Sequence, residues 1–259
     1  MNIDLTGRSA VVTGASRGIG LAVTRALVAS GAHVTAGARE SSAELDKLTA
    51  DGSVQVIEAD LAAAAGPATL VAAAGDRVDI LVNNVGSAPA RTRGFLAVTD
   101  EEWLATLNIN LMAAVRATRA ALPPMLAAGK GVIVNMCSVN AVFSDPFVID
   151  YSAAKAALAS FSKALSKEVG GKGIRVNTIS PGPVETDLWL GDQGIAETVG
   201  RATGAPPDQV ARQFAASVPT GRFSTPEEVA ALVVVLASDI GANVTGSDIR
   251  IDGGLIPTW

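Results

Sequence analysis

The sequence predicts an α/β fold, a doubly wound parallel sheet of seven strands with helices on both faces. Short runs rich in β-branched residues alternate with alanine-rich stretches of helical period, which is the pattern of strand–helix–strand units. The chain has 259 residues, of which 49% are hydrophobic, so it can bury a large core. Because no linker, repeat or low-complexity stretch divides it, we expect a single domain over residues 1–259.

Strands are expected where short runs of valine, isoleucine and threonine occur, at 9–13, 33–38, 54–58, 78–82, 131–136, 174–180 and 247–251. Helices are expected where alanine and leucine recur with helical spacing, at 18–30, 41–49, 67–74, 100–128, 151–170 and 226–237. The segments 87–98 and 181–219 carry proline or glycine without such spacing. Since loops of this length usually serve as lids or binding segments, we expect both at the rim of a site and place a substrate lid at about 185–217.

Composition and charge exclude several classes of function. A formal net charge of −5 and a low aromatic content of 4% argue against a nucleic acid or a membrane surface as the main partner. The only cysteine is Cys137 and the only histidine is His33, which excludes a disulfide framework and a histidine-rich metal site. We therefore expect no metal, and treat Cys137 as a small buried group because no histidine is available to activate it.

The same composition favours a reducing compartment, and we expect a cytoplasmic protein. The first residues lack the basic and apolar regions of a signal peptide. The most apolar windows, 61–74 and 230–237, are broken by charge, glycine or proline before they reach the roughly 18 residues needed to span a bilayer.

A glycine-rich turn follows the first expected strand and reads TGASRGIG over residues 13–20. Gly14 allows a tight turn, Gly18 lets the backbone approach a pyrophosphate, and Gly20 lets the helix pack against the sheet. The free N–H groups at the start of the helix face the anion. This turn predicts a Rossmann-type dinucleotide-binding fold, although by itself it is also compatible with an ordinary glycine-rich turn.

The next strand indicates which dinucleotide binds. It ends at Ala38, where an acid would contact the ribose hydroxyls of NAD, and it is followed by Arg39. Arg17 lies within the glycine turn. Two cations and no acid favour the 2′-phosphate of NADP(H), although either arginine could be a solvated surface charge.

The candidate catalytic pair is Tyr151 and Lys155, the first of which is the only tyrosine in the chain. Residues four apart share one face of a helix, so the Lys155 ammonium can lie beside the ligand that the Tyr151 phenol contacts. A nearby cation lowers the pKa of a phenol, which allows Tyr151 to act as an acid or a base. Ser138 follows the strand at 131–136 and precedes this helix.

These motifs together resemble the short-chain dehydrogenase/reductase family, in its single-domain branch, over essentially the whole chain. The resemblance also rests on Asp60, on Asn-Asn-Val-Gly at 83–86, on Asn110, on Pro-Gly-Pro at 181–183 followed by Thr186, and on Asp-Gly-Gly at 252–254. It implies an NADPH-dependent oxidoreductase that transfers a hydride between the cofactor and a ketone or secondary alcohol. Val85 departs from the alanine that is more usual in the family.

The resemblance also implies the roles of single residues. Ser138 would hydrogen-bond the substrate oxygen, Tyr151 would donate the proton in reduction, Lys155 would hold the nicotinamide ribose, and Asn110 would keep a water in a proton relay. The cofactor contacts it implies are Gly14, Ser16, Arg17, Gly18, Ile19, Gly20, Arg39, Asp60, Leu61, Asn83, Gly86, Tyr151, Lys155, Pro181, Gly182, Val184 and Thr186.

Other functions remain open at this point. The fold could sense NADP(H) or a protein partner, or carry a dehydratase, epimerase or dehalogenase activity. For a reductase, the expected pocket walls at 87–93, 140–147 and 188–190, with Trp189, are mainly apolar or small, which favours a carbonyl or alcohol substrate on an aliphatic or aromatic skeleton. The similarity to 3-oxoacyl-(acyl-carrier-protein) reductases allows a thioester-linked substrate, for which Lys130 and Lys172 are a thin docking patch.

The resemblance further implies a homotetramer, with a dimer as the simpler alternative. We expect the helices at 100–128 and 151–170 to pair with those of a neighbouring subunit through small apolar residues. These are Ala113, Ala114, Ala117, Ala156, Ala157 and Ala159.

Overall fold

A seven-stranded parallel sheet in the order β3-β2-β1-β4-β5-β6-β7 forms the centre of the protein. The computed structural model describes residues 3–50 and 52–258. The strands are β1 (Ser9–Thr13), β2 (His33–Ala38), β3 (Val54–Glu58), β4 (Ile80–Asn83), β5 (Gly131–Met136), β6 (Ile174–Pro181) and β7 (Asp248–Ile251). The predicted doubly wound sheet is therefore confirmed, with β4 beginning two residues later than expected.

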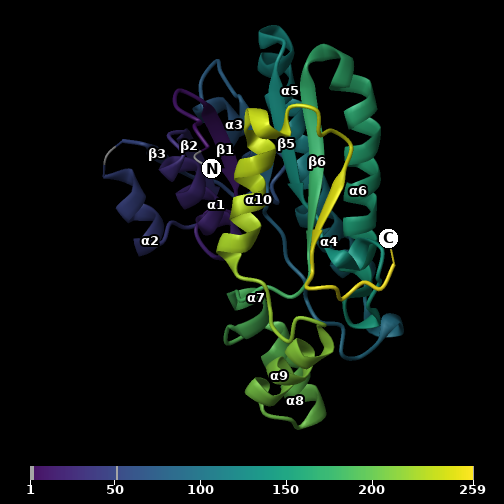
Figure 1. The fold of residues 1–259 in the computed structure, drawn as a ribbon. Coiled ribbons are helices and arrows are strands. Elements are labelled where there is room, and N and C mark those ends of the chain that lie inside the picture. The colour runs from purple at the N-terminus through teal and green to yellow at the C-terminus, as the bar shows by residue number, and fades with distance from the viewer. Residues whose placement is uncertain (1–2, 51, 259) are drawn as a thin grey trace.

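Helices cover both faces of the sheet (Figure 1). Neighbouring residues of β1 separate the two layers, since Val12 packs in one apolar core and Val11 in the other. The helices α1 (Gly18–Ala29) and α10 (Pro226–Ala237) supply Leu27 and Val233 to the first core. The second core contains residues of α3 (Gly66–Ala73), α5 (Ala113–Ala128) and α6 (Ile149–Val169). A short α2 (Ala43–Asp46) follows β2.

The helix expected at 100–128 is interrupted. The chain forms α4 (Asp100–Leu107), then a π-helical turn (Asn108–Met112), then α5. The amide of Asn110 donates 3.0 Å to the carbonyl of Thr106, an acceptor that an uninterrupted helix would pair with a backbone N–H. The chain is thus helical over the whole expected range, with a π-helical turn that the sequence did not predict.

The segment after β6 forms three helices that project beyond one edge of the sheet, at the bottom of Figure 1. They are α7 (Asp187–Leu190), α8 (Ile195–Thr203) and α9 (Pro207–Ser217). The ring of Trp189 lies edge-on to Phe214 at 4.8 Å and to Phe223 at 5.2 Å between centroids. Trp189 thus joins α7 to Phe214 on α9, and its expected place in a pocket wall stays a prediction.

The tail after β7 holds both ends of this segment. The Gly182 N–H donates to the carbonyl of Ile251, and the Thr220 N–H donates to the carbonyl of Gly253. A Cβ on Gly253 would lie only 2.3 Å from Thr220 Oγ1, so a side chain there would push the segment away. These two hydrogen bonds therefore fix both ends of the three-helix segment to the chain around Ile251 and Gly253.

The carboxyl ends of the four central strands β1, β4, β5 and β6 lie along one edge of the sheet, the edge from which α7 to α9 project (Figure 1). In open parallel sheets, ligands bind outside this edge where the strand order reverses. Here the reversal falls between β1 and β4, which are hydrogen-bonded neighbours. Within residues 3–50 and 52–258, no helix is both long and apolar enough to cross a membrane.

We predict that Trp189→Ala speeds amide hydrogen exchange across α8 and α9 while leaving exchange in the sheet unchanged, because the ring joins these helices to Phe223. Leu190→Ala is the matched control, since Leu190 lies on the same short helix with half of its surface exposed. Hydrogen exchange measured by mass spectrometry distinguishes the two variants. Equal exchange in both would show that Trp189 does not anchor the segment.

Candidate active site

The glycine turn after β1 has the close contacts that its sequence predicts. Gly14 has φ of +68° and Gly18 has φ of +53°, a region that favours glycine. A Cβ on Gly20 would lie 2.0 Å from the Gly14 carbonyl oxygen, which no side chain can accommodate. Helix α1 begins at Gly18, so its first N–H groups face outward from the turn. The turn is shaped to accept a phosphate group against the backbone.

Asn84 braces this turn from β4, a role that the sequence did not reveal. Its side-chain amide donates to the carbonyls of Thr13 at 3.1 Å and Gly14 at 3.0 Å. The Thr13 hydroxyl in turn accepts from the backbone N–H groups of Asn84 and Val85. The glycine turn is therefore fixed to the neighbouring central strand at the point where the strand order reverses.

Two arginines beside the turn are accessible to an anion. Arg17 precedes α1 with 73% of its side chain exposed, and its Nη1 lies 3.8 Å from the Asp187 carboxylate on α7. Arg39 follows β2 and is exposed. Ser42, at the start of α2, donates through its hydroxyl to the carbonyl of Ser16 within the turn. An exposed arginine therefore follows each of β1 and β2, and the Ser42 hydrogen bond links α2 to the glycine turn.

Tyr151 and Lys155 lie on α6, as predicted, where the helix passes the carboxyl end of β5. The Lys155 Nζ is 5.5 Å from the centre of the Tyr151 ring and donates 2.8 Å to the carbonyl of Met136. Lys155 is only 3% exposed. Ser138 is buried beyond β5, and its hydroxyl accepts from the Asn140 N–H at 3.1 Å.

Burial controls the protonation of this pair. It lowers the pKa of Lys155 to about 8, and it raises the pKa of Tyr151 to about 12 against an opposing hydrogen bond from Ser138. In the free protein, loss of hydration raises the Tyr151 pKa more than the hydrogen bond from Ser138 lowers it, and the lowering expected from Lys155 stays a prediction. At neutral pH, Tyr151 holds its proton and Lys155 is largely charged.

Asn110 and Gly86 meet at the same place. A Cβ on Gly86 would lie 2.7 Å from the Asn110 Oδ1 and 3.6 Å from the Lys155 Nζ. Asn110 is 1% exposed, and its amide donates to the carbonyl of Ser87 at 2.8 Å. The structure therefore brings Gly86, Asn110 and Lys155 together, as expected.

Comparison with known proteins gives a consistent family. A family model described as enoyl-(acyl carrier protein) reductase matches residues 14–256. The 3-oxoacyl-[acyl-carrier-protein] reductase FabG of Chlamydia trachomatis is 33% identical, with 97% of this chain and 98% of that protein covered. The D-threitol dehydrogenase of Mycolicibacterium smegmatis is 38% identical over 96% of this chain and 93% of its own length.

The chain belongs to the short-chain dehydrogenase/reductase family. Two solved structures of the family cover it completely. L-sorbose reductase from Gluconobacter frateurii, complexed with NADPH and L-sorbose, superposes with a TM-score of 0.90 at 32% identity and 100% coverage of both chains. A gluconate 5-dehydrogenase from Beutenbergia cavernae with bound NADP gives 0.87 at 35% identity, also with 100% coverage of both. The resemblance seen in the sequence is confirmed, and the chain is an oxidoreductase of this family.

Three of the expected cofactor residues have buried side chains. The Asn83 side chain is buried and donates to Asn135 and Thr118 inside the protein. Leu61 is 2% exposed and belongs to the second apolar core, and Val184 is buried in the first. The cofactor contacts expected of Asn83, Leu61 and Val184 stay a prediction.

The remaining expected contacts lie in segments that follow β1 and β3 or end and follow β6. Thr186 reaches it, because its Cγ2 would lie 3.2 Å from a Cβ on Gly18. Asp60 is exposed after β3 and accepts from the N–H of Ala62. Pro181 ends β6, and Gly182 packs against Asp252. Ile19 is half-buried against the first core, so it faces inward as the helix begins.

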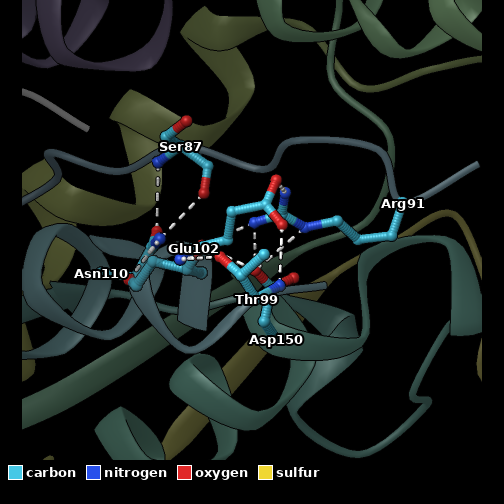
Figure 2. A network of polar contacts seen from close by, with 7 residues as sticks. Ser87, Arg91, Thr99, Glu102, Asn110 and Asp150 are labelled. Carbon is cyan, nitrogen blue, oxygen red and sulfur yellow. Dashed lines mark hydrogen bonds and ion pairs between the residues drawn. The ribbon is translucent and has the colours of Figure 1, made fainter. Parts of the chain in front are cut away.

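One polar cluster beside the site was not predicted from the sequence. Figure 2 shows the Arg91 guanidinium between Glu102 and Asp150, the residue that precedes Tyr151. A signal was available, since Arg91 is a cation in an aperiodic loop and Asp150 is an acid next to the candidate catalytic tyrosine. Nothing in the sequence links the two residues, which are 59 positions apart.

The carboxyl edge also carries exposed apolar side chains. Val142, Phe143 and Phe147 follow β5, and Leu188 and Leu190 lie on α7, all between 43% and 63% exposed. Solvated surfaces do not usually gather large apolar side chains around one edge of a sheet. This rim is suited to an apolar ligand.

Cys137 is buried beside Lys155 and, as expected, is a small buried group.

Proposed function

We propose that the protein is an NADPH-dependent ketone reductase in which Tyr151 is the general acid. The observation that carries this proposal is the meeting of Tyr151, Lys155, Asn110 and Gly86 at the edge where the glycine turn also opens. A protonated phenol beside a buried ammonium is the arrangement required to deliver a proton to a carbonyl oxygen.

The residues present fit the cofactor. The glycine turn leaves no room for a side chain at Gly20 and exposes the start of α1, which suits a pyrophosphate. Ala38 ends β2 without an acid, and the exposed Arg39 follows it beside Arg17, which suits a 2′-phosphate. The solved relatives described with NADP or NADPH support the same choice.

The chain's own residues then have separate tasks. NADPH, when bound, supplies the hydride that adds to the carbonyl carbon. The Ser138 hydroxyl orients the carbonyl oxygen, and the Tyr151 phenol transfers its proton to that oxygen, which yields a secondary alcohol. The Lys155 ammonium stabilises the resulting phenolate, and Asn110 holds the relay water through which the proton is replaced.

The substrate that fits best is a ketone on an apolar skeleton. The exposed Val142, Phe143 and Leu188 provide apolar contacts at the rim, whereas a polyhydroxylated ketone would need polar partners there. A thioester-linked ketone is compatible with this rim. Lys130 and Lys172, however, precede β5 and β6, so they lie at the opposite edge from Tyr151 of the same chain. These two lysines are therefore not placed to dock a carrier protein at the site of their own chain.

The segment 185–217 acts in this proposal as a lid over the substrate, within one domain that spans the chain. Its apolar Leu188 and Leu190 would be covered when ligands fill the cleft, which would exclude water from the reaction. The hydrogen-exchange measurement proposed for Trp189, repeated with NADPH and a substrate analogue, tests this role through protection of α7. We place the protein in the cytoplasm, where the buried thiol of Cys137 stays reduced.

We further propose that the protein is a homotetramer, with α4 and α5 in one interface. Leu104 is 66% exposed on α4 and lines an apolar groove of about 540 Å³ with Leu107, Leu111 and Met112. The expectation that the alanines of α5 face a partner is wrong, since Ala113, Ala114 and Ala117 are buried within the subunit.

The variant Leu104→Asp tests this interface. It should convert the tetramer to smaller species in sedimentation velocity, because the introduced carboxylate would be buried in the apolar interface without a partner. A monomeric wild type at micromolar concentration would contradict the proposal.

Tyr151→Phe tests the reaction. The change removes the only phenol while keeping the ring, so NADPH affinity measured by fluorescence should stay within about twofold while turnover falls by at least about 100-fold, the range that general acid catalysis supplies. NADPH oxidation is followed over a panel of apolar ketones, free and thioester-linked, and polyhydroxylated ketones. If the variant keeps more than about a tenth of wild-type turnover on its best ketone, Tyr151 is not the general acid.

Arg39→Ala tests the cofactor. Removal of the exposed guanidinium should weaken NADPH binding by about tenfold and leave NADH binding unchanged, because only NADPH carries the 2′-phosphate that the guanidinium would contact. Arg25→Ala is the control, since Arg25 is exposed on α1 away from the turn. Dissociation constants for both cofactors are measured by fluorescence titration. Equal losses for NADPH and NADH would refute the assignment.

A further inference from the structure

A fully buried carboxylate directly precedes the proposed general acid. The Asp150 side chain has 0% exposure, and its Oδ2 accepts from Arg91 Nε at 3.1 Å, Arg91 Nη2 at 2.5 Å and the Thr106 hydroxyl at 2.7 Å. Burial alone would raise the pKa of Asp150, but the hydrogen bonds from Arg91 and Thr106 outweigh it, so the pKa lies below its ordinary value. Asp150 is therefore charged at the first turn of α6, where the helix dipole also favours an anion.

Arg91 joins this carboxylate to two other segments. Its side chain is 10% exposed, and its Nη1 donates to Glu102 on α4 at 2.7 Å. Its backbone N–H donates to the carbonyl of Phe147, just before α6. The planar guanidinium thus holds α4, the turn before α6 and the start of α6 in one fixed arrangement (Figure 2).

The network continues to Asn110 without a break. Thr106 donates its hydroxyl to Asp150, while its carbonyl accepts from the Asn110 amide at 3.0 Å. Asn110 is also held by Ser87, whose N–H donates to Asn110 Oδ1 and whose carbonyl accepts from the Asn110 amide. One end of the network is covalently next to Tyr151, and the other end is the residue beside Lys155 and Gly86.

Stability is a weak reason for such a pair. Buried ion pairs are often no more stabilising than apolar side chains of similar volume, because both charges lose their hydration. Asp150 Oδ1 adds to this cost, since it is buried without a hydrogen-bond partner among residues 3–50 and 52–258. A role in packing alone would be served as well by two apolar side chains. What an apolar pair lacks is the fixed direction of the hydrogen bonds.

We propose that Arg91 and Asp150 are positioning residues, which hold the start of α6 and the π-helical turn so that Tyr151 and Asn110 keep one geometry around Lys155. This inference rests on the proposed role of Tyr151 as the general acid. Neither residue touches the reacting atoms in this proposal, and their effect passes through the backbone next to Tyr151 and through Thr106 to Asn110.

The decisive test is the double variant Arg91→Met/Asp150→Leu, which replaces the pair by apolar side chains of similar size. It should melt at or above the wild-type temperature and bind NADPH within about twofold of wild type, because the fold and the glycine turn are intact. Its kcat should fall by about 10- to 100-fold, which is the scale of a misplaced catalytic group. A label on the only tyrosine gives a readout independent of turnover: the Tyr151 ring signal in NMR should broaden or split.

Single variants keep the test decisive if the double variant does not fold. Arg91→Lys retains the charge but not the planar fork, and Asp150→Asn retains the shape but not the charge, so both should lower kcat by a smaller factor with KM for NADPH unchanged. Arg77→Met is the matched control, because Arg77 pairs with the buried Asp79 at the opposite edge of the sheet. It should lower the melting temperature and leave kcat unchanged.

The outcomes separate this inference from the proposed function. Wild-type kcat and an unchanged tyrosine signal in the double variant, with Tyr151→Phe inactive, would overturn the positioning role alone. A Tyr151→Phe variant that keeps its turnover would overturn the proposed function and with it this inference. A kcat loss in Arg77→Met equal to that in the double variant would show that the effect is one of general stability and would overturn the positioning role.

Discussion

The arrangement of the site depends on the burial of a single ammonium group. Lys155 is 3% exposed, and its Nζ donates to the carbonyl of Met136, a neutral acceptor. Its charge is therefore only partly compensated, which lowers its pKa to about 8. The same loss of water keeps the Tyr151 phenol protonated. A partly compensated cation beside a neutral acid is ready to stabilise the phenolate that forms when the proton leaves.

The parallel sheet and its close contacts make this burial possible. Because β4 and β5 are parallel neighbours, the chain that leaves β4 at Asn83 and the chain that leaves β5 at Met136 reach the same edge. Gly86 then allows Asn110 to approach, since a Cβ there would lie 2.7 Å from the Asn110 Oδ1. Asn110 in turn breaks the helix at the π-helical turn. The π-helical turn and the absence of a side chain at Gly86 thus both allow Asn110 to lie at this position.

The sequence predicts those features that depend on residues close to one another along the chain. The bounds of β1 and β2, the strain-free use of Gly14 and the face shared by Tyr151 and Lys155 follow from periodicity and from neighbours along the chain. The π-helical turn at 108–112 places Asn110 against Ser87, a residue of a distant loop, and the ring contacts of Trp189 involve the distant Phe214 and Phe223. The Arg91–Asp150 pair and the upward shift of the Tyr151 pKa likewise arise only when distant segments pack. The family resemblance supplied the positions of the site residues, whereas their protonation required the packed structure.

The most direct test is the ionisation of Tyr151, which is the only tyrosine in the chain. With tyrosine labelled with carbon-13 at the ring carbon that bears the hydroxyl, the free protein gives one NMR signal, whose shift reports ionisation of the phenol. If burial controls the site, the signal stays at the protonated position well above pH 10.0, the ordinary pKa, since the pKa is raised to about 12. A midpoint at or below the ordinary value would contradict the account, because the Lys155 charge and not the loss of water would then set the state of the acid.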